Sequence, residues 1–150
     1  MSTREEDLRR IEAEVGVLIR RVKRVVAVRA REVHEDMHPM TYFILTHLSQ
    51  LGPMRGADLA DAFGMDKGGV SRQVQALVDL GLVERQPDPE DRRAILLDAT
   101  DEGRERLAVQ RQRSSVRFDQ RLSGWTDEGL AAFADQLAAY NSALADDRDD

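Results

Sequence analysis

The chain has no cysteine, few aromatic residues and no long apolar run. The absence of cysteine among its 150 residues excludes disulfides, thiolate metal sites and thiol redox switches. No segment approaches the roughly 20 apolar residues that a membrane-spanning helix needs. The first residues, 1–7, lack the apolar core of a signal peptide. We therefore expect a cytoplasmic protein with no membrane partner.

An excess of positive charge is also missing. The net charge is −6 at pH 7, which argues mildly against nucleic acid as a partner. Affinity for DNA nevertheless depends on the charge close to the phosphates rather than on the total. Residues 67–78 contain Lys67 and Arg72 and no acid. The sequence therefore permits DNA binding in which base or shape contacts supplement a thin basic patch.

Near the start of the chain, apolar residues recur at steps of three and four. This spacing predicts an amphipathic helix from Asp7 to about Asp36. A helix of about thirty residues is long for a small domain, so we expect it to pack on a second subunit. The apolar residues of this pattern are Leu8, Ile11, Val15, Leu18, Ile19, Val22, Val25, Val26 and Val33.

The middle of the chain alternates short helical patterns with a hairpin pattern. Two short helices joined by a tight turn and followed by a hairpin form a winged helix-turn-helix. Residues 87–91 should form the turn, because two prolines and three acids suit no strand ladder. Asp66 is placed to cap the second of the two helices. The predicted helices are 40–51, with Phe43, Ile44, Leu48 and Leu51 on one side, 55–63 and 67–80, and the predicted strands are 82–86 and 94–99.

Two further helices follow, opened by Thr100 and Thr126 as caps. The predicted fold class is mainly α (α+β), with six helices and a wing of two or three β-strands. Its segments are an N-terminal dimerisation helix (1–36), a winged helix-turn-helix (37–100), C-terminal dimerisation helices (101–146) and a frayed tail (147–150).

In a helix-turn-helix, exposed residues near the start of the second helix meet base edges in the major groove. We call these residues the recognition face. Arg72 has the geometry to bind guanine, and Gln73 or Gln75 to bind adenine. Two glycines here cost about 1 kcal/mol each in a helix; either they permit close approach of DNA or they belong to a frayed first turn. The recognition face comprises Lys67, Gly68, Gly69, Ser71, Arg72, Gln73 and Gln75.

Four motifs resemble those of the MarR family of winged-helix transcriptional regulators. The most specific is the wing signature at 91–100, which opens with Asp91-Arg92-Arg93 and closes on Thr100. The chain departs from the family in one position, because Ala99 stands where leucine usually precedes the threonine. The other motifs are 81–85 (Gly-Leu-Val-Glu-Arg), 58–60 (Asp-Leu-Ala) and the Ser71-Arg72 pair.

The resemblance implies a homodimeric repressor of a palindromic double-stranded DNA operator, with no enzymatic activity and no cofactor. It implies that Arg93, at the wing tip with Arg92, enters the minor groove, and that Asp91 holds the Arg93 guanidinium by a charge-assisted pair. It also implies release by a small aromatic or anionic effector. Candidate effector-binding residues are His38, Met40, Tyr42, Phe43 and Phe118.

Two rival interpretations stay open. His34 and His38 match the spacing of a zinc peptidase, but Pro39 interrupts the helix that this chemistry requires. A zinc-responsive regulator remains as an alternative, with weak candidate ligands in His34, Glu35, His38 and His47. The second alternative is a winged-helix protein-interaction module that binds no operator.

Overall fold

The computed structural model describes residues 1–146, so the tail predicted to fray, 147–150, lies outside the described residues. The chain divides into two compact units, the first ending at Gln112 and the second beginning at Arg113. Helix α5 (Asp101–Arg121) contributes residues to both. No described helix is long and apolar enough to cross a membrane.

Helix α1 (Arg4–Val33) opens the first unit. It begins three residues before the predicted start, because Thr3 and Glu6 form a capping box with each other's backbone N–H groups. It ends three residues early, because His34 adopts an extended backbone. Only the last third of the helix contributes buried residues, which are Val26, Ala30 and Val33.

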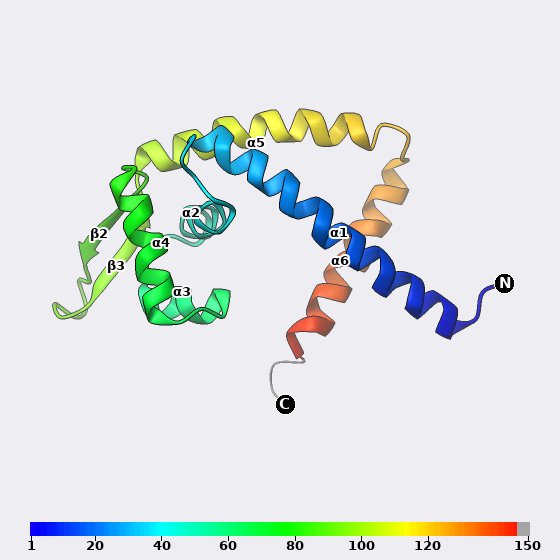
Figure 1. The fold of residues 1–150 in the computed structure, drawn as a ribbon, viewed down its shortest axis with the longest axis horizontal. Helices are drawn as coiled ribbons and strands as arrows, with labels where there is room; N and C mark the ends of the chain where they lie inside the picture. Colours follow the sequence, from blue (N-terminus) through cyan, green and yellow to red (C-terminus); the bar gives the residue numbers. More distant parts are fainter. Residues whose placement is uncertain (147–150) are drawn as a thin grey trace. The chain divides into compact units, whose positions relative to one another are not determined.

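The core of the first unit lies among α1, α2 (Pro39–Leu51), α3 (Gly56–Phe63), α4 (Lys67–Asp79) and the sheet (Figure 1). Leu45 and Leu77 are fully buried within it. The apolar side predicted for α2 is only partly buried, since Ile44 and Leu48 are fully buried but Phe43 is 41% exposed and Leu51 is 65% exposed. Tyr42 and Leu45 take the inward positions instead.

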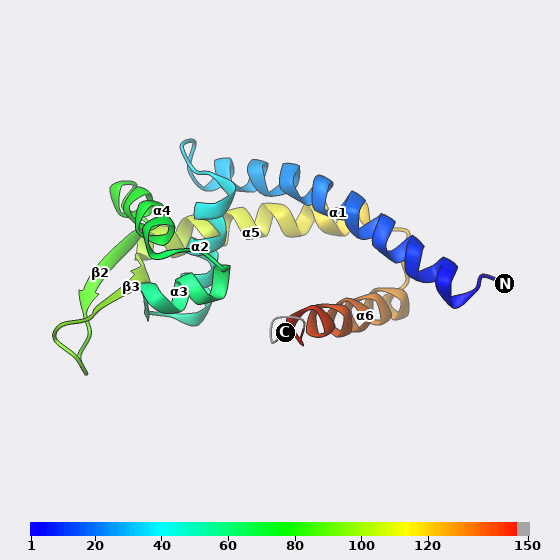
Figure 2. The same cartoon turned by 60° about the horizontal axis from the view of Figure 1, so that its bottom comes forward.

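The sheet has three antiparallel strands, β1 (Met54–Arg55), β2 (Val83–Pro87) and β3 (Ile95–Ala99), in the order β1-β3-β2. The exclusion of both prolines from the ladder was wrong for Pro87, which pairs with Ile95. Proline is tolerated there because Pro87 is the last residue of an edge strand. In both views the loop between β2 and β3 projects beyond α3 and α4 as a wing (Figures 1 and 2).

The structure confirms the predicted caps of the last two helices. Thr100 accepts a hydrogen bond from the backbone N–H of Gly103 at the start of α5, and Thr126 accepts one from Gly129 at the start of α6 (Asp127–Asp146). In the second unit, Trp125 and Phe133 form an edge-to-face ring pair. Among α6 residues with described side chains none is buried. The predicted fold class of six helices and a small sheet is confirmed.

Candidate nucleic-acid interface

Helix α4 presents most of the recognition face to solvent and anchors itself by its other face. Its first turn is capped rather than frayed, because the Asp66 carboxylate accepts a hydrogen bond from the backbone N–H of Gly69 at 2.6 Å. Val70, Val74 and Leu77 are buried beneath it. The exposed members of the recognition face are Lys67, Gly68, Ser71, Arg72 and Gln75, while Gln73 is half-buried.

The two glycines at the start of α4 occupy different environments. Gly68 is exposed, and a Cβ there would make ordinary contacts with the Arg72 and Asp66 side chains. Gly69 is buried, and a Cβ there would lie 2.9 Å from Asp66 Oδ1 and 3.1 Å from the Met65 methyl carbon. Gly69 therefore makes room for its own cap and does not share the exposed surface of its neighbours.

A hydrogen-bonded chain ties α4 to β2. The Arg85 guanidinium donates to Gln75 Oε1 at 3.0 Å, and Gln75 Nε2 donates to Asp79 Oδ1 at 2.7 Å. Arg85 is exposed on β2 and was absent from the predicted site. In the sequence, Arg85 appeared only as the last residue of the 81–85 motif, with no role of its own.

The wing tip carries Arg92 and Arg93, both exposed. The predicted ion pair between Asp91 and the Arg93 guanidinium is not present in the described structure. Asp91 Oδ1 instead accepts a hydrogen bond from the backbone N–H of Arg93 at 3.0 Å. An aspartate that bonds the backbone two residues on is a common turn former. Asp91 therefore shapes the turn and leaves the Arg93 guanidinium projecting.

An ion pair that the sequence reasoning missed joins the wing to the helix-turn-helix. Arg55 donates through Nε and Nη2 to Asp88 Oδ2, at 3.1 and 2.6 Å. The other oxygen of Asp88 accepts the backbone N–H of Glu90 at 2.9 Å. These backbone and guanidinium bonds lower the pKa of Asp88, whose side chain is only 8% exposed. The same carboxylate raises the pKa of Arg55. The only signal of this ion pair in the sequence was the position of Asp88 at the start of the predicted turn.

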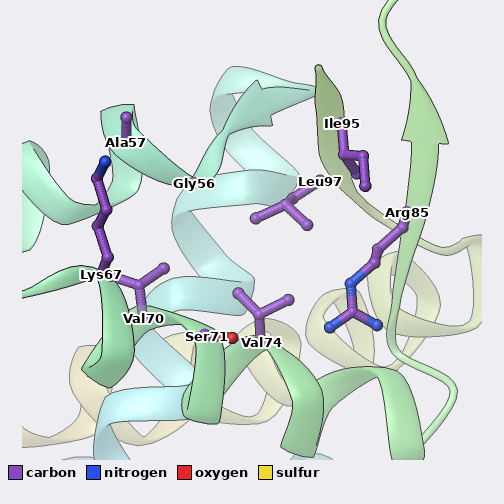
Figure 3. A pocket seen from close by; sticks show the side chains of 9 residues that line it. All are labelled: Gly56, Ala57, Lys67, Val70, Ser71, Val74, Arg85, Ile95 and Leu97. Atoms are coloured by element: carbon purple, nitrogen blue, oxygen red, sulfur yellow. The ribbon is translucent and has the colours of Figure 1, made fainter. Parts of the chain in front are cut away.

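A hollow of about 260 Å³ lies between α4 and the sheet (Figure 3). Val70, Val74 and Leu97 form its apolar lining, while Lys67 and Arg85 lie at opposite ends of it. A second hollow of about 280 Å³, beside the wing, is lined by Arg85 and Arg92 among others. None of the residues that line either hollow is acidic.

The four weak metal candidates are not brought together. His34 follows the end of α1 and accepts the backbone N–H of Asp36, whereas His38 precedes α2. The two histidines therefore do not share a helical face, as a zinc peptidase requires. His47 packs its ring against Phe63. Among the side chains that the structure describes, no group of three or more His, Asp or Glu is placed to hold a metal ion.

The candidate effector residues have contrasting environments. Tyr42 is buried, and its hydroxyl donates to Gln110 Oε1 at 3.0 Å. Phe43 is 41% exposed beside it, with ring centroids 6.0 Å apart. Met40 packs at the edge of the core, and His38 is exposed at the start of α2. Phe118 is 56% exposed and belongs to the second unit.

A capped second helix, an exposed polar face upon it and an arginine-bearing hairpin beside it define a winged helix-turn-helix DNA-binding protein. Residues 35–94 match the model of the MarR family. The chain is 31% identical over 136 residues to an HTH-type transcriptional regulator, YxaD, of Bacillus subtilis (strain 168), spanning 91% of this chain and 94% of that protein. The chain belongs to the MarR family, and is thus a transcriptional regulator of the MarR type.

Solved structures share the fold. A mutant MarR from E. coli complexed with operator DNA superimposes with a TM-score of 0.70 at 18% identity, covering 93% of this chain and 99% of that one. A MarR-family regulator from Listeria monocytogenes complexed with a 26mer DNA gives a TM-score of 0.73 at 18% identity, covering 98% and 92%. Both likenesses concern the fold alone.

Proposed function

We propose that this chain is a repressor that binds a palindromic DNA operator in the cytoplasm as a homodimer. The observation that carries the proposal is the pairing of the recognition face on α4 with Arg92 and Arg93 on the wing. The two surfaces belong to one unit and leave their cationic side chains exposed. Such an arrangement suits an α-helix in the major groove and an arginine in the adjacent minor groove.

The exposed apolar residues of α1 support the homodimer. They recur along one stripe of the helix and remain about half exposed in the single chain. Exposed apolar stripes of this kind mark subunit contacts. Two-fold symmetry then requires a palindromic operator with half-sites about one helical turn apart. We define the α1 stripe as Leu8, Ile11, Leu18, Ile19 and Val22.

We further propose that a small aromatic or anionic molecule releases the operator. Support comes from Phe43, an aromatic ring left 41% exposed next to the buried Tyr42–Gln110 hydrogen bond. A ligand stacked there would contact α2 directly. Addition of benzoate and related aryl acids to the operator complex, followed by fluorescence anisotropy, tests this. An effect that Phe43→Ala abolishes supports the assignment, and one that it leaves unchanged contradicts it.

Fluorescence anisotropy with DNA from upstream of the chain's own gene tests the central proposal. The wild-type protein should bind this DNA more tightly than a mixed-sequence duplex, with an affinity that falls as salt rises. Arg72→Ala and Arg93→Ala should each weaken operator binding by about 1–3 kcal/mol, as expected for the loss of a specific base contact. Binding without sequence preference, or none, would favour the protein-interaction module.

A further inference from the structure

We propose that Arg85 binds a backbone phosphate of the operator, and that Gln75 positions the Arg85 guanidinium instead of reading a base. This inference rests on the proposed DNA-binding function and assigns a new role to two residues of the same surface. It replaces the sequence-based expectation that Gln75 pairs with adenine.

The amide of Gln75 is already committed at both ends. Its oxygen accepts from Arg85 at 3.0 Å, and its nitrogen donates to Asp79 at 2.7 Å. Bidentate recognition of adenine needs the same oxygen and the same nitrogen at once. These two bonds fix the orientation of the Gln75 amide and leave it one lone pair and one N–H, whereas no such bonds hold the amide of Gln73 in the described structure.

The guanidinium of Arg85, in contrast, keeps donors in reserve. Arginine has five N–H groups, and the hydrogen bond to Gln75 engages Nη2. Its side chain projects from β2 toward α4 (Figure 3) and lines both hollows. Lys67 lies at the far end of the first hollow and Arg92 beside the second. With no acid among the lining residues, this surface is complementary to a polyanion.

The position of Arg85 between two DNA-reading elements identifies the anion. If α4 occupies the major groove and the wing the neighbouring minor groove, the sugar-phosphate backbone that separates these grooves must pass between them. Arg85 stands on β2, between α4 and the wing tip, so it faces that backbone. A contact to phosphate fixes register and adds affinity without reading sequence. The guanidinium can hold a phosphate oxygen while Gln75 still holds Nη2.

Salt titrations of DNA binding test the inference with five variants, each measured on DNA from upstream of the chain's own gene and on a mixed-sequence duplex. Arg85→Gln should reduce the slope of log K against log salt by about 0.9 per bound protomer, which corresponds to about a fivefold loss at 0.15 M salt. A dimer that carries both substitutions should lose about thirtyfold, equally on the two DNAs. Arg85→Lys should keep the wild-type slope.

Gln75→Ala should weaken binding to both DNAs by the same factor, and this factor should not exceed the one for Arg85→Gln. Gln73→Ala is its matched control, since it removes a neighbouring amide that lacks the Arg85 bond. Arg31→Gln removes an equal charge from an exposed position on α1 that lines neither hollow, and should leave the slope unchanged. Circular dichroism confirms the folding of each variant.

Two outcomes would overturn the inference. One is an Arg85→Gln protein that folds and binds with the wild-type salt slope. The other is a Gln75→Ala loss confined to the operator, which would restore the role of Gln75 as a base reader. A wild-type protein that fails to distinguish the two DNAs would instead count against the proposed function itself, and so the two failures are separable.

Discussion

Leu45 and Leu18 belong to helices of the same unit, yet Leu45 is fully buried on α2 and Leu18 is 48% exposed on α1. The winged domain buries most of its large apolar residues within one chain, although Phe43, Leu51 and Ile95 stay exposed. The α1 stripe and the described part of α6 keep theirs at the surface, including Phe133 at 49% and Leu144 at 50%. The contrast separates a region that folds on its own core from the apolar surfaces that we propose contact a second subunit.

The burial of the α1 stripe can be compared with the cost of forming a dimer. Full burial of an aliphatic side chain contributes about 1.5–3 kcal/mol, and the α1 stripe residues are already about half buried. Two copies of five residues would then add on the order of 10 kcal/mol. The loss of translational and rotational freedom on association costs a comparable amount, roughly 4–15 kcal/mol. We therefore expect α6 to contribute to the interface as well.

The largest expected effect comes from charging the α1 stripe. Leu18→Glu combined with Ile19→Glu should give a folded monomer, because unpaired carboxylates resist burial in an interface. Loss of bivalent binding should lower operator affinity about a hundredfold or more. Sedimentation and anisotropy measure the two effects. Leu51→Glu, a charge at a 65% exposed leucine of α2, is the matched control. If the double variant stays dimeric, the α1 stripe is not the subunit contact, and its exposure does not distinguish it from the winged domain.

The second prediction compares two leucines of α2. Leu45→Ala should reduce the free energy of unfolding by about 2–5 kcal/mol, since it leaves a cavity in the core. Leu51→Ala should change it by no more than about 0.5 kcal/mol. Urea denaturation at one fixed protein concentration compares them, because dimerisation would make stability depend on concentration. Equal losses would show that Leu51 is covered in solution.

The sequence predicted best what depends on near neighbours. The caps at Asp66, Thr100 and Thr126 were correct because a capping side chain and its N–H partner lie three residues apart. The order of helices and strands followed from periodicity and from turn residues. The turn formed by Asp91 was located correctly, although the hydrogen bond goes to the Arg93 backbone and not to its side chain.

Errors arose where residues distant in sequence decide. Arg55 and Asp88 lie 33 positions apart, and they meet because β1 and β2, the strands that carry or precede them, both pair with β3. Gln75 was assigned to a base contact because the sequence does not reveal its hydrogen bond to Arg85, which joins helix α4 to strand β2. Phe43 was grouped with Ile44 and Leu48 because the apolar residues of α2 fit more than one face, and the packing of α2 against its neighbours selects the buried one.

A smaller effect distinguishes the two glycines of α4. Gly68→Ala should stabilise the protein by up to about 1 kcal/mol through helix propensity. Gly69→Ala should gain nothing or lose stability, because its Cβ would displace the Asp66 cap, which is worth about 1 kcal/mol. Thermal denaturation compares the two variants. If Gly68→Ala is more stable but binds operator less tightly, then close approach of DNA explains that glycine; unchanged binding would argue against it.

The smallest effect concerns the Arg55–Asp88 ion pair that joins the wing to the helix-turn-helix. Bonds to the Glu90 N–H and Arg55 lower the pKa of Asp88 in the folded state, so the carboxylate stabilises the fold above the ordinary pKa of about 3.9. This contribution should disappear as pH falls from 3.9 through the lowered value. Asp88→Asn should therefore be less stable than wild type at neutral pH, with a smaller loss of stability on acidification through this window. Arg55→Gln should flatten the pH dependence only partly, since the Glu90 hydrogen bond remains. Urea unfolding between pH 5 and pH 2, at roughly half-unit steps, measures these slopes; identical slopes for wild type and Asp88→Asn would show that the wing is held without this carboxylate.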